Sequence, residues 1–203
     1  MLRPPQCAEG GSLGTTGIPA CVRFPHMDIQ HFRVKLFATP ASHPHLGGAI
    51  PVFHRWIQEK RLPETMIDVS DYEHVPEGPG IILVCHEAIY GLDQERGKLG
   101  LLYNRRTAID GSVEDRLRQA VNAAESAAAL LEAEPEFAGQ LHFDRQQWEV
   151  VVNDRALAPN TDATWKSLSP VIQATFDSII GAGRYRIEHH ADPRELFRVT
   201  VSA

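Results

Sequence analysis

Ten consecutive residues, Ile81 to Tyr90, constrain the fold more than any other segment of this chain. The run is apolar at both odd and even positions, with the exception of His86 and Glu87. A strand with one face in solvent alternates apolar and polar residues, whereas a strand covered on both faces does not. The run therefore predicts a central strand with two buried faces, which begins after the break at residues 78–80.

Further strands are predicted on both sides of this run. Segments with strand-type patterns are 29–38, 66–72, 99–106, 141–143, 148–152, 185–189 and 197–201. The segment 99–106 returns after a polar stretch and is expected to pair antiparallel with the central strand. Polar residues 144–147 predict a turn between the two short strands on either side of them. The last two segments read as a hairpin.

Three segments have apolar residues at helical spacing. The first begins near Pro51, where a proline fits the first helical turn. The second has Ser112 as its N-cap and runs to Pro135. In the third, over 165–180, Pro170 must kink the helix or start a new one. These elements predict an α+β fold, with a mostly antiparallel sheet of about seven to eight strands and three helices packed on it.

The chain divides into a short leader and a patterned body. Residues 1–26 contain four prolines and four glycines without helical or strand periodicity, so a disordered leader is expected. Because Met27 opens the first strand pattern, one hypothesis is that the leader is an upstream-start artefact, and a genuine disordered tail is the other. Residues 27–203, rich enough in apolar side chains for a core, are expected to form a single α+β domain.

Charge and cysteine content limit the possible partners and compartment. The formal net charge of −6 disfavours nucleic acid as a partner. No apolar run reaches the roughly 18 residues that a membrane-spanning helix needs, so no membrane association is expected. Cys7, Cys21 and Cys85 lack the spacing of zinc or redox motifs, which fits a reducing compartment. We therefore expect a cytoplasmic protein in which Cys85 is a small buried hydrophobe.

The two ionisable residues inside the apolar run are the first candidates for chemistry. Neighbours in a strand point to opposite faces, so His86 and Glu87 would both be buried and would both need partners. We assign acid–base catalytic roles to these two residues. Tyr103 and Arg105, on the returning strand, are assigned to ligand binding, with Arg105 as an anion-binding group. A structural histidine and a structural carboxylate–arginine pair are the alternative interpretation.

Asp68 and Asp71 complete the candidate ligand-binding set, because two carboxylates near His86 could act as acid and base. Residues three apart in a strand face opposite sides, which favours solvated aspartates over one shared site. The histidines at 43, 45 and 54 do not match a metal-binding motif, and no phosphate-binding loop or nucleophile elbow is present. No metal and no cofactor are therefore expected.

Several strings of residues are similar to an uncharacterised group of bacterial proteins. They are Val52 to Gln58, Ile67 to Tyr72 with His74-Val75-Pro76, His86-Glu87, Gly100 to Arg105, Asn153-Asp154-Arg155 and Ala158 to Thr161. The resemblance covers most of the chain after Met27. It implies a bacterial, cytosolic origin and a body that begins near Met27, and it brings no activity with it.

Two interpretations of function follow from these patterns. The first is a non-catalytic binding or accessory protein whose partner is a small molecule or another protein, because the fold patterns are complete while mechanistic motifs are missing. The alternative is a small-molecule enzyme with an acid–base site at the end of the central strand pair. Convergence of His86, Tyr103, Arg105 and Asp68 around one pocket would favour the enzyme, and separately satisfied side chains would favour the binding protein.

Overall fold

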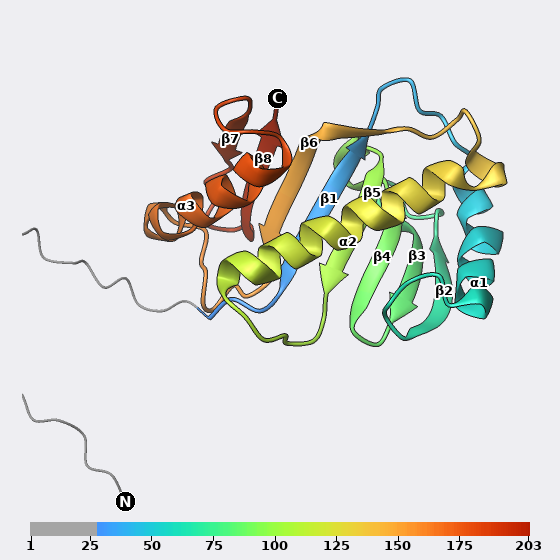
Figure 1. Cartoon of the computed structure of the whole chain (residues 1–203), viewed down its shortest axis with the longest axis horizontal. Coiled ribbons are helices and arrows are strands. Elements are labelled where there is room, and N and C mark those ends of the chain that lie inside the picture. Colours follow the sequence, from blue (N-terminus) through green and yellow to red (C-terminus); the bar gives the residue numbers. More distant parts are fainter. Residues whose placement is uncertain (1–27) are drawn as a thin grey trace, which may run out of the picture.

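The computed structural model describes residues 28–203, which form one antiparallel sheet and three α-helices (Figure 1). The strand order is β2-β3-β4-β5-β1-β6-β8-β7. The strands are β1 (Phe32–Ala38), β2 (Met66–Tyr72), β3 (Gly80–Cys85), β4 (Ala88–Asp93), β5 (Gly100–Arg105), β6 (Phe143–Val152), β7 (Arg186–His189) and β8 (Phe197–Ser202). The helices are α1 (Ala49–Glu59), α2 (Val113–Ala133) and α3 (Asp162–Ile179). The predicted α+β fold is confirmed; the predicted leader lies outside the described residues.

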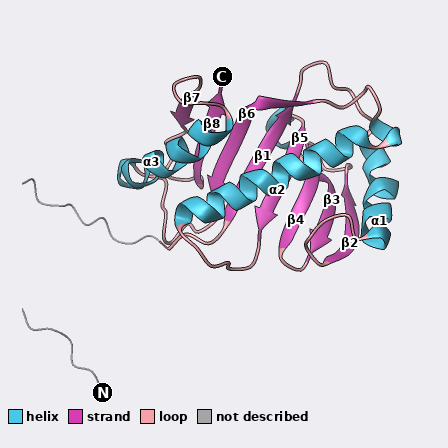
Figure 2. Ribbon diagram, viewed as in Figure 1, coloured by secondary structure: helices cyan, strands magenta, loops and turns pink. Residues whose placement is uncertain are grey.

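The core lies between the sheet and the three helices, which share one of its faces (Figure 2). In Figure 1, α2 crosses diagonally in front of β5 and β1, while α1 lies beside β2. On β1 the alternation is regular: Phe32, Val34 and Leu36 belong to the core under the helices. The intervening residues of β1 therefore point to the opposite face of the sheet. No helix within 28–203 is long and apolar enough to cross a membrane.

The sequence signals at the helix ends are confirmed. Ser112 and Asp115 form a capping box at the start of α2: Asp115 N donates to Ser112 Oγ at 3.1 Å and Ser112 N donates to the Asp115 carboxylate at 3.0 Å. Pro51 occupies the first turn of α1. Pro170 lies inside α3, which runs through it as one helix with the proline on its exposed side.

The prediction of a central strand over Ile81 to Tyr90 is wrong, because this run is a tight hairpin. The chain reverses at His86 and Glu87, and Val84 pairs with Ile89 across the turn. Both strands have apolar residues at odd and at even positions. One face of each strand packs under the helices, and the other face carries partly buried aliphatic side chains. A fully covered strand and two such strands in succession give the same pattern, and only the polar pair at the centre marks the turn.

The predicted turn at residues 144–147 is also wrong, since β6 continues through it. The pairing of β6 with β1 is regular as far as Leu36 and Trp148, and then shifts so that Ala38 faces Phe143. The polar residues form an irregularity in this ladder instead of a reversal. Arg145 and the amide of Phe143 are both held by the carboxylate of Glu132 on α2. The observed order therefore has four strands between α1 and α2, and one between α2 and α3.

Strand β2 forms one edge of the sheet, and two of the predicted ligand-binding residues protect this edge. Val69 N donates to the Asp68 carboxylate at 2.8 Å, and Glu73 N donates to the Asp71 carboxylate at 2.8 Å. Both aspartates are exposed. Val69 belongs to β2, whereas Glu73 lies in the turn that follows it, so only the Asp68 bond engages an amide of the strand itself. The negative charges of both aspartates repel a second copy of the same edge.

Replacement of both Asp68 and Asp71 by alanine is therefore expected to increase self-association. The amide of Val69 would lose its side-chain acceptor and the edge would lose two negative charges, next to the exposed side chain of Ile67. Sedimentation equilibrium at matched concentrations is the measurement, and the double variant should show a higher average mass than the unchanged chain. A control in which Glu59 and Asp110 are changed to alanine removes the same charge elsewhere; an equal rise in mass for this control would contradict the edge-protection role.

Candidate functional site

The predicted catalytic pair, His86 and Glu87, forms the exposed turn of the β3–β4 hairpin. The His86 side chain is 70% exposed, and its Nδ1 lies 3.7 Å from Glu87 Oε1. Glu87 accepts hydrogen bonds from Thr65 N at 2.8 Å and from Thr65 Oγ at 3.0 Å. The bond from the Thr65 amide is the main cause of a lowered pKa for the Glu87 carboxyl. This turn thus holds the backbone of the segment that connects α1 to β2.

The predicted binding residues Tyr103 and Arg105 also have contacts of their own. Tyr103 is buried under α2, and its hydroxyl oxygen lies 3.0 Å from Gln119 Nε2. Burial raises the pKa of this phenol, although Arg105 and Gln119 oppose the shift. Arg105 Nε donates to the backbone oxygen of Thr107 at 2.9 Å. Tyr103 and Arg105 therefore lie close to each other, whereas His86 and Asp68 are exposed and make contacts elsewhere.

A buried carboxylate that the sequence patterns did not single out lies next to Thr65. Glu64 is only 8% exposed, and its Oε2 accepts a hydrogen bond from the Tyr90 hydroxyl at 2.8 Å. Within residues 28–203 this is the one hydrogen bond that the carboxylate receives. The Tyr90 ring in turn meets the ring of Tyr103 edge-on, with centroids 5.0 Å apart. Glu64 and Tyr90 thus form the polar end of an otherwise aromatic and aliphatic core region.

Glu64 and Tyr90 line a pocket of about 430 Å³ between α2 and the segment that follows α1. One stripe of α2 forms the facing wall, since the residues on it are spaced three and four apart and so share a side of the helix. These residues are Asp115, Arg118, Gln119, Asn122, Ala123 and Ser126. Leu62 and Pro63 complete the lining with apolar surface.

The ionised groups of this pocket favour a cationic occupant. The lining contains two carboxylates, those of Glu64 and Asp115, and one guanidinium, that of Arg118. Arg118 is already paired with Glu114 one turn earlier on α2, and it lies 3.8 Å from Asp115. Burial, and then the charge of Glu64, raise the pKa of the Tyr90 hydroxyl, so this group stays a neutral hydrogen-bond donor. The negative charge of Glu64 is therefore not balanced inside the pocket.

No family model, curated protein or solved structure matches this chain. An assignment of function therefore depends on the geometry of the side chains themselves. No group of three or more His, Cys, Asp or Glu side chains within 28–203 is placed to hold a metal ion. Cys85 is fully buried as predicted, and burial is the largest cause of the rise in its thiol pKa to about 12.

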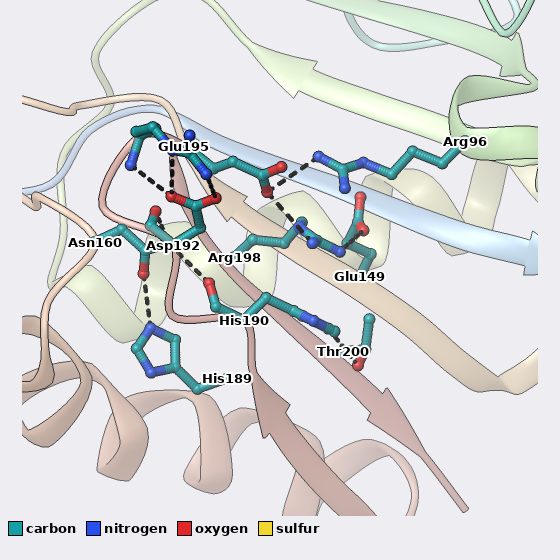
Figure 3. A network of polar contacts seen from close by, with 10 residues as sticks. Arg96, Glu149, Asn160, His189, His190, Asp192, Glu195, Arg198 and Thr200 are labelled. Carbon is teal, nitrogen blue, oxygen red and sulfur yellow. Dashed lines mark hydrogen bonds and ion pairs between the residues drawn. The ribbon is translucent and has the colours of Figure 1, made fainter.

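A second polar network joins the β7–β8 hairpin to its surroundings (Figure 3). Asn160 Nδ2 donates to the backbone oxygens of His190 and Asp192 at 2.8 and 2.9 Å, while its Oδ1 lies 2.7 Å from His189 Nε2. The imidazole of His189 stacks on Trp165, with centroids 5.3 Å apart. Burial lowers the pKa of both histidines. These contacts fix the hairpin turn.

Only an indirect signal in the sequence points to the Glu64 pocket. Glu64 follows Pro63 in a segment without periodicity, where an acidic residue is ordinarily exposed. Tyr90 ends the apolar run Ile81 to Tyr90, and this position predicts no functional role for it. A usable signal is the hydroxyl of Tyr90 itself, because a tyrosine buried in a sheet needs a hydrogen-bond partner.

Proposed function

We propose that this chain is a non-catalytic binding protein that holds a small molecule by a protonated amine. The observation that carries this proposal is the carboxylate of Glu64, which is nearly buried and receives one hydrogen bond, from the neutral donor Tyr90, within the described residues. A buried carboxylate is costly unless it is paired or well hydrogen-bonded. An ammonium group in the pocket would supply the missing positive charge through a charge-assisted hydrogen bond.

The size and lining of the pocket support a small ligand. A volume of about 430 Å³ lies within the usual range for small-molecule sites. Leu62, Pro63 and Ala123 offer apolar surface to a hydrocarbon group. Gln119 and Asn122 offer side-chain amides, which can donate to or accept from further polar atoms of the ligand. A compact amine with one ring or a short chain suits these dimensions.

The contacts of the β3–β4 turn favour binding over acid–base catalysis there. His86 is largely exposed, and Glu87 is engaged by Thr65. A catalytic pair needs a shared substrate position within hydrogen-bond reach of both groups, in a site that excludes water. The turn instead supports the backbone beside Glu64, so we assign Glu87 a positioning role in the binding site.

The Glu64→Gln variant tests the proposal with benzylamine and benzyl alcohol as probes. These molecules differ in the group that would meet Glu64, and the glutamine keeps an oxygen that can accept the hydrogen bond of Tyr90. Titration calorimetry should show binding of benzylamine, much weaker binding of benzyl alcohol, and a loss of about 10- to 100-fold in benzylamine affinity for the variant, as expected for a hydrogen bond to a charged group.

Glu59→Gln is the matched control, because Glu59 is exposed at the end of α1 and removal of its charge leaves the pocket intact. This control should bind benzylamine as the unchanged chain does. Equal affinity of the unchanged chain for the amine and the alcohol would overturn the proposal. Equal losses in the Glu64 and Glu59 variants would also overturn it, since they would indicate a general charge effect.

A further inference from the structure

The sheet face opposite the helices carries a second cleft, of about 610 Å³. One wall is the loop that follows β1, residues 39–44, and the other is the loop between β4 and β5, which contains the short 3-10 helix η2 (Glu95–Gly97). Phe37 of β1 and Gln147 of β6 lie at its base. Phe37 alternates with the core residues of β1 and therefore lies on the far side of the sheet from the Glu64 pocket.

Two residues of the η2 wall form ion pairs with other elements of the fold. Arg96 donates to Glu195 at 3.2 Å, and Glu195 also accepts from Arg198 at 3.3 Å, which links η2 to the β7–β8 turn (Figure 3). Arg33 pairs with Glu95 at 3.2 Å. Arg96 adopts a left-handed backbone conformation, with φ of 62°, which costs energy for a residue with a side chain. The ion pairs connect this loop to β1 and to the β7–β8 turn.

The charge in the cleft has the opposite sign to the net charge of the chain. Lys98 is the one Lys, Arg, Asp or Glu side chain in the lining, and His43 is the one imidazole; the other polar groups are hydroxyls and amides. Of the carboxylates beside η2, Asp93 pairs with Lys35 and Glu95 pairs with Arg33. Glu149 and Glu188 lie in the adjoining hollow, which Lys98 also lines. Within residues 28–203, Lys98 makes no ion pair. An exposed, positively charged group is therefore available to an anion.

The base of the cleft combines the aromatic ring of Phe37, which is 9% exposed, with the side-chain amide of Gln147. The ammonium of Lys98 lies 5.5 Å from the centre of the Phe37 ring, in a cation–π contact. Pro40, Pro44 and Leu99 extend the apolar surface around this ring. A flat hydrocarbon group would gain burial against these side chains while an acidic group attached to it reaches Lys98.

We infer that this cleft is a second binding site, for a small aromatic anion whose acidic group pairs with Lys98 and whose ring packs against Phe37. The acidic group is a carboxylate or a phosphate, both of which a lysine binds as a point charge. The site is independent of Glu64, since it lies on the other face of the sheet and selects the opposite charge. The chain would then bind two ligands of complementary charge on its two faces.

Benzoate and phenyl phosphate are the probes that test this inference, with benzyl alcohol as the neutral comparison. At low ionic strength, calorimetry should show binding of at least one anion and weaker binding of the alcohol. Lys98→Met should lower the affinity for that anion by up to about fivefold, as expected for an exposed ion pair, and Lys98→Arg should retain it. The anion that binds more tightly identifies the acidic group, and added salt should weaken the complex.

Lys166→Met is the matched control, because Lys166 is exposed on α3, on the helix-covered side of the sheet. This variant and Glu64→Gln should both bind the anion as the unchanged chain does. An absence of binding for both anions at millimolar concentration would overturn the inference. Unchanged affinity in Lys98→Met, or an equal loss in Lys166→Met, would overturn it as well.

Discussion

Replacement of Asp93 by alanine is expected to lower the free energy of unfolding by about 3–5 kcal/mol, the range measured when one member of a buried ion pair is removed. Asp93 is 1% exposed and Lys35 is 4% exposed, and the two side chains are in direct contact. Burial raises the pKa of Asp93, and the charge of Lys35 opposes this rise. Without the carboxylate, the ammonium of Lys35 would remain in a region that excludes water.

Chemical denaturation of three variants measures this effect. Asp93→Ala should be strongly destabilised, whereas the double variant Lys35→Met with Asp93→Leu should recover most of the loss, because no isolated charge remains buried. Arg194→Ala is the control, since Arg194 and Asp192 form an exposed pair that is expected to contribute about 1 kcal/mol or less. A change below about 1 kcal/mol for Asp93→Ala would contradict the buried pairing.

Replacement of Phe176 by alanine is expected to cost about 3–5 kcal/mol, as for other fully buried aromatic side chains. Phe176 attaches α3 to the sheet: its ring centroid lies 6.0 Å from that of Trp148 on β6 and 6.3 Å from that of Tyr185. The contact with Trp148 joins α3 to a strand that is distant in the sequence, whereas Tyr185 follows α3 directly in the chain. The loss would therefore weaken the packing of α3 on the end of the sheet formed by β6, β8 and β7.

Urea denaturation followed by circular dichroism and by tryptophan fluorescence measures this second effect. The two signals should change together, because α3 and the sheet share one continuous core. Leu157→Ala is the control: Leu157 is half exposed, and its truncation should change stability by about 0.5 kcal/mol or less. A variant Phe176→Ala as stable as the control would contradict the docking of α3 through this side chain.

The elements whose signals are local were predicted correctly. The capping box at Ser112 and the strand over 66–72 each depend on residues that are close in the sequence, so the sequence indicates them directly. The reversal at His86 and Glu87 was missed because apolar side chains lie on both faces of β3 and β4. Solvent exposure of the polar pair is a tertiary property, and a one-dimensional pattern does not contain it.

The binding pocket was not predictable for a related reason. Glu64 becomes a buried carboxylate only because α2 lies over it and Tyr90 reaches it from the sheet. The contact between Glu64 and Tyr90 depends on the pairing of Tyr90 with Tyr103 in the sheet, and the pocket depends on which side of α2 faces the sheet. The sequence pointed to Tyr103 and to Glu87, which lie behind and beside the pocket, and it missed the group at its centre.

The position of bound benzylamine tests the central proposal most directly. In a crystal structure of the complex, the ammonium nitrogen should lie within about 2.7–3.2 Å of a carboxylate oxygen of Glu64, with the ring between Leu62 and the facing stripe of α2. Benzylamine bound at another surface, or oriented in the pocket with its ring towards Glu64 and its nitrogen in solvent, would contradict the assignment of Glu64 as the amine-binding group.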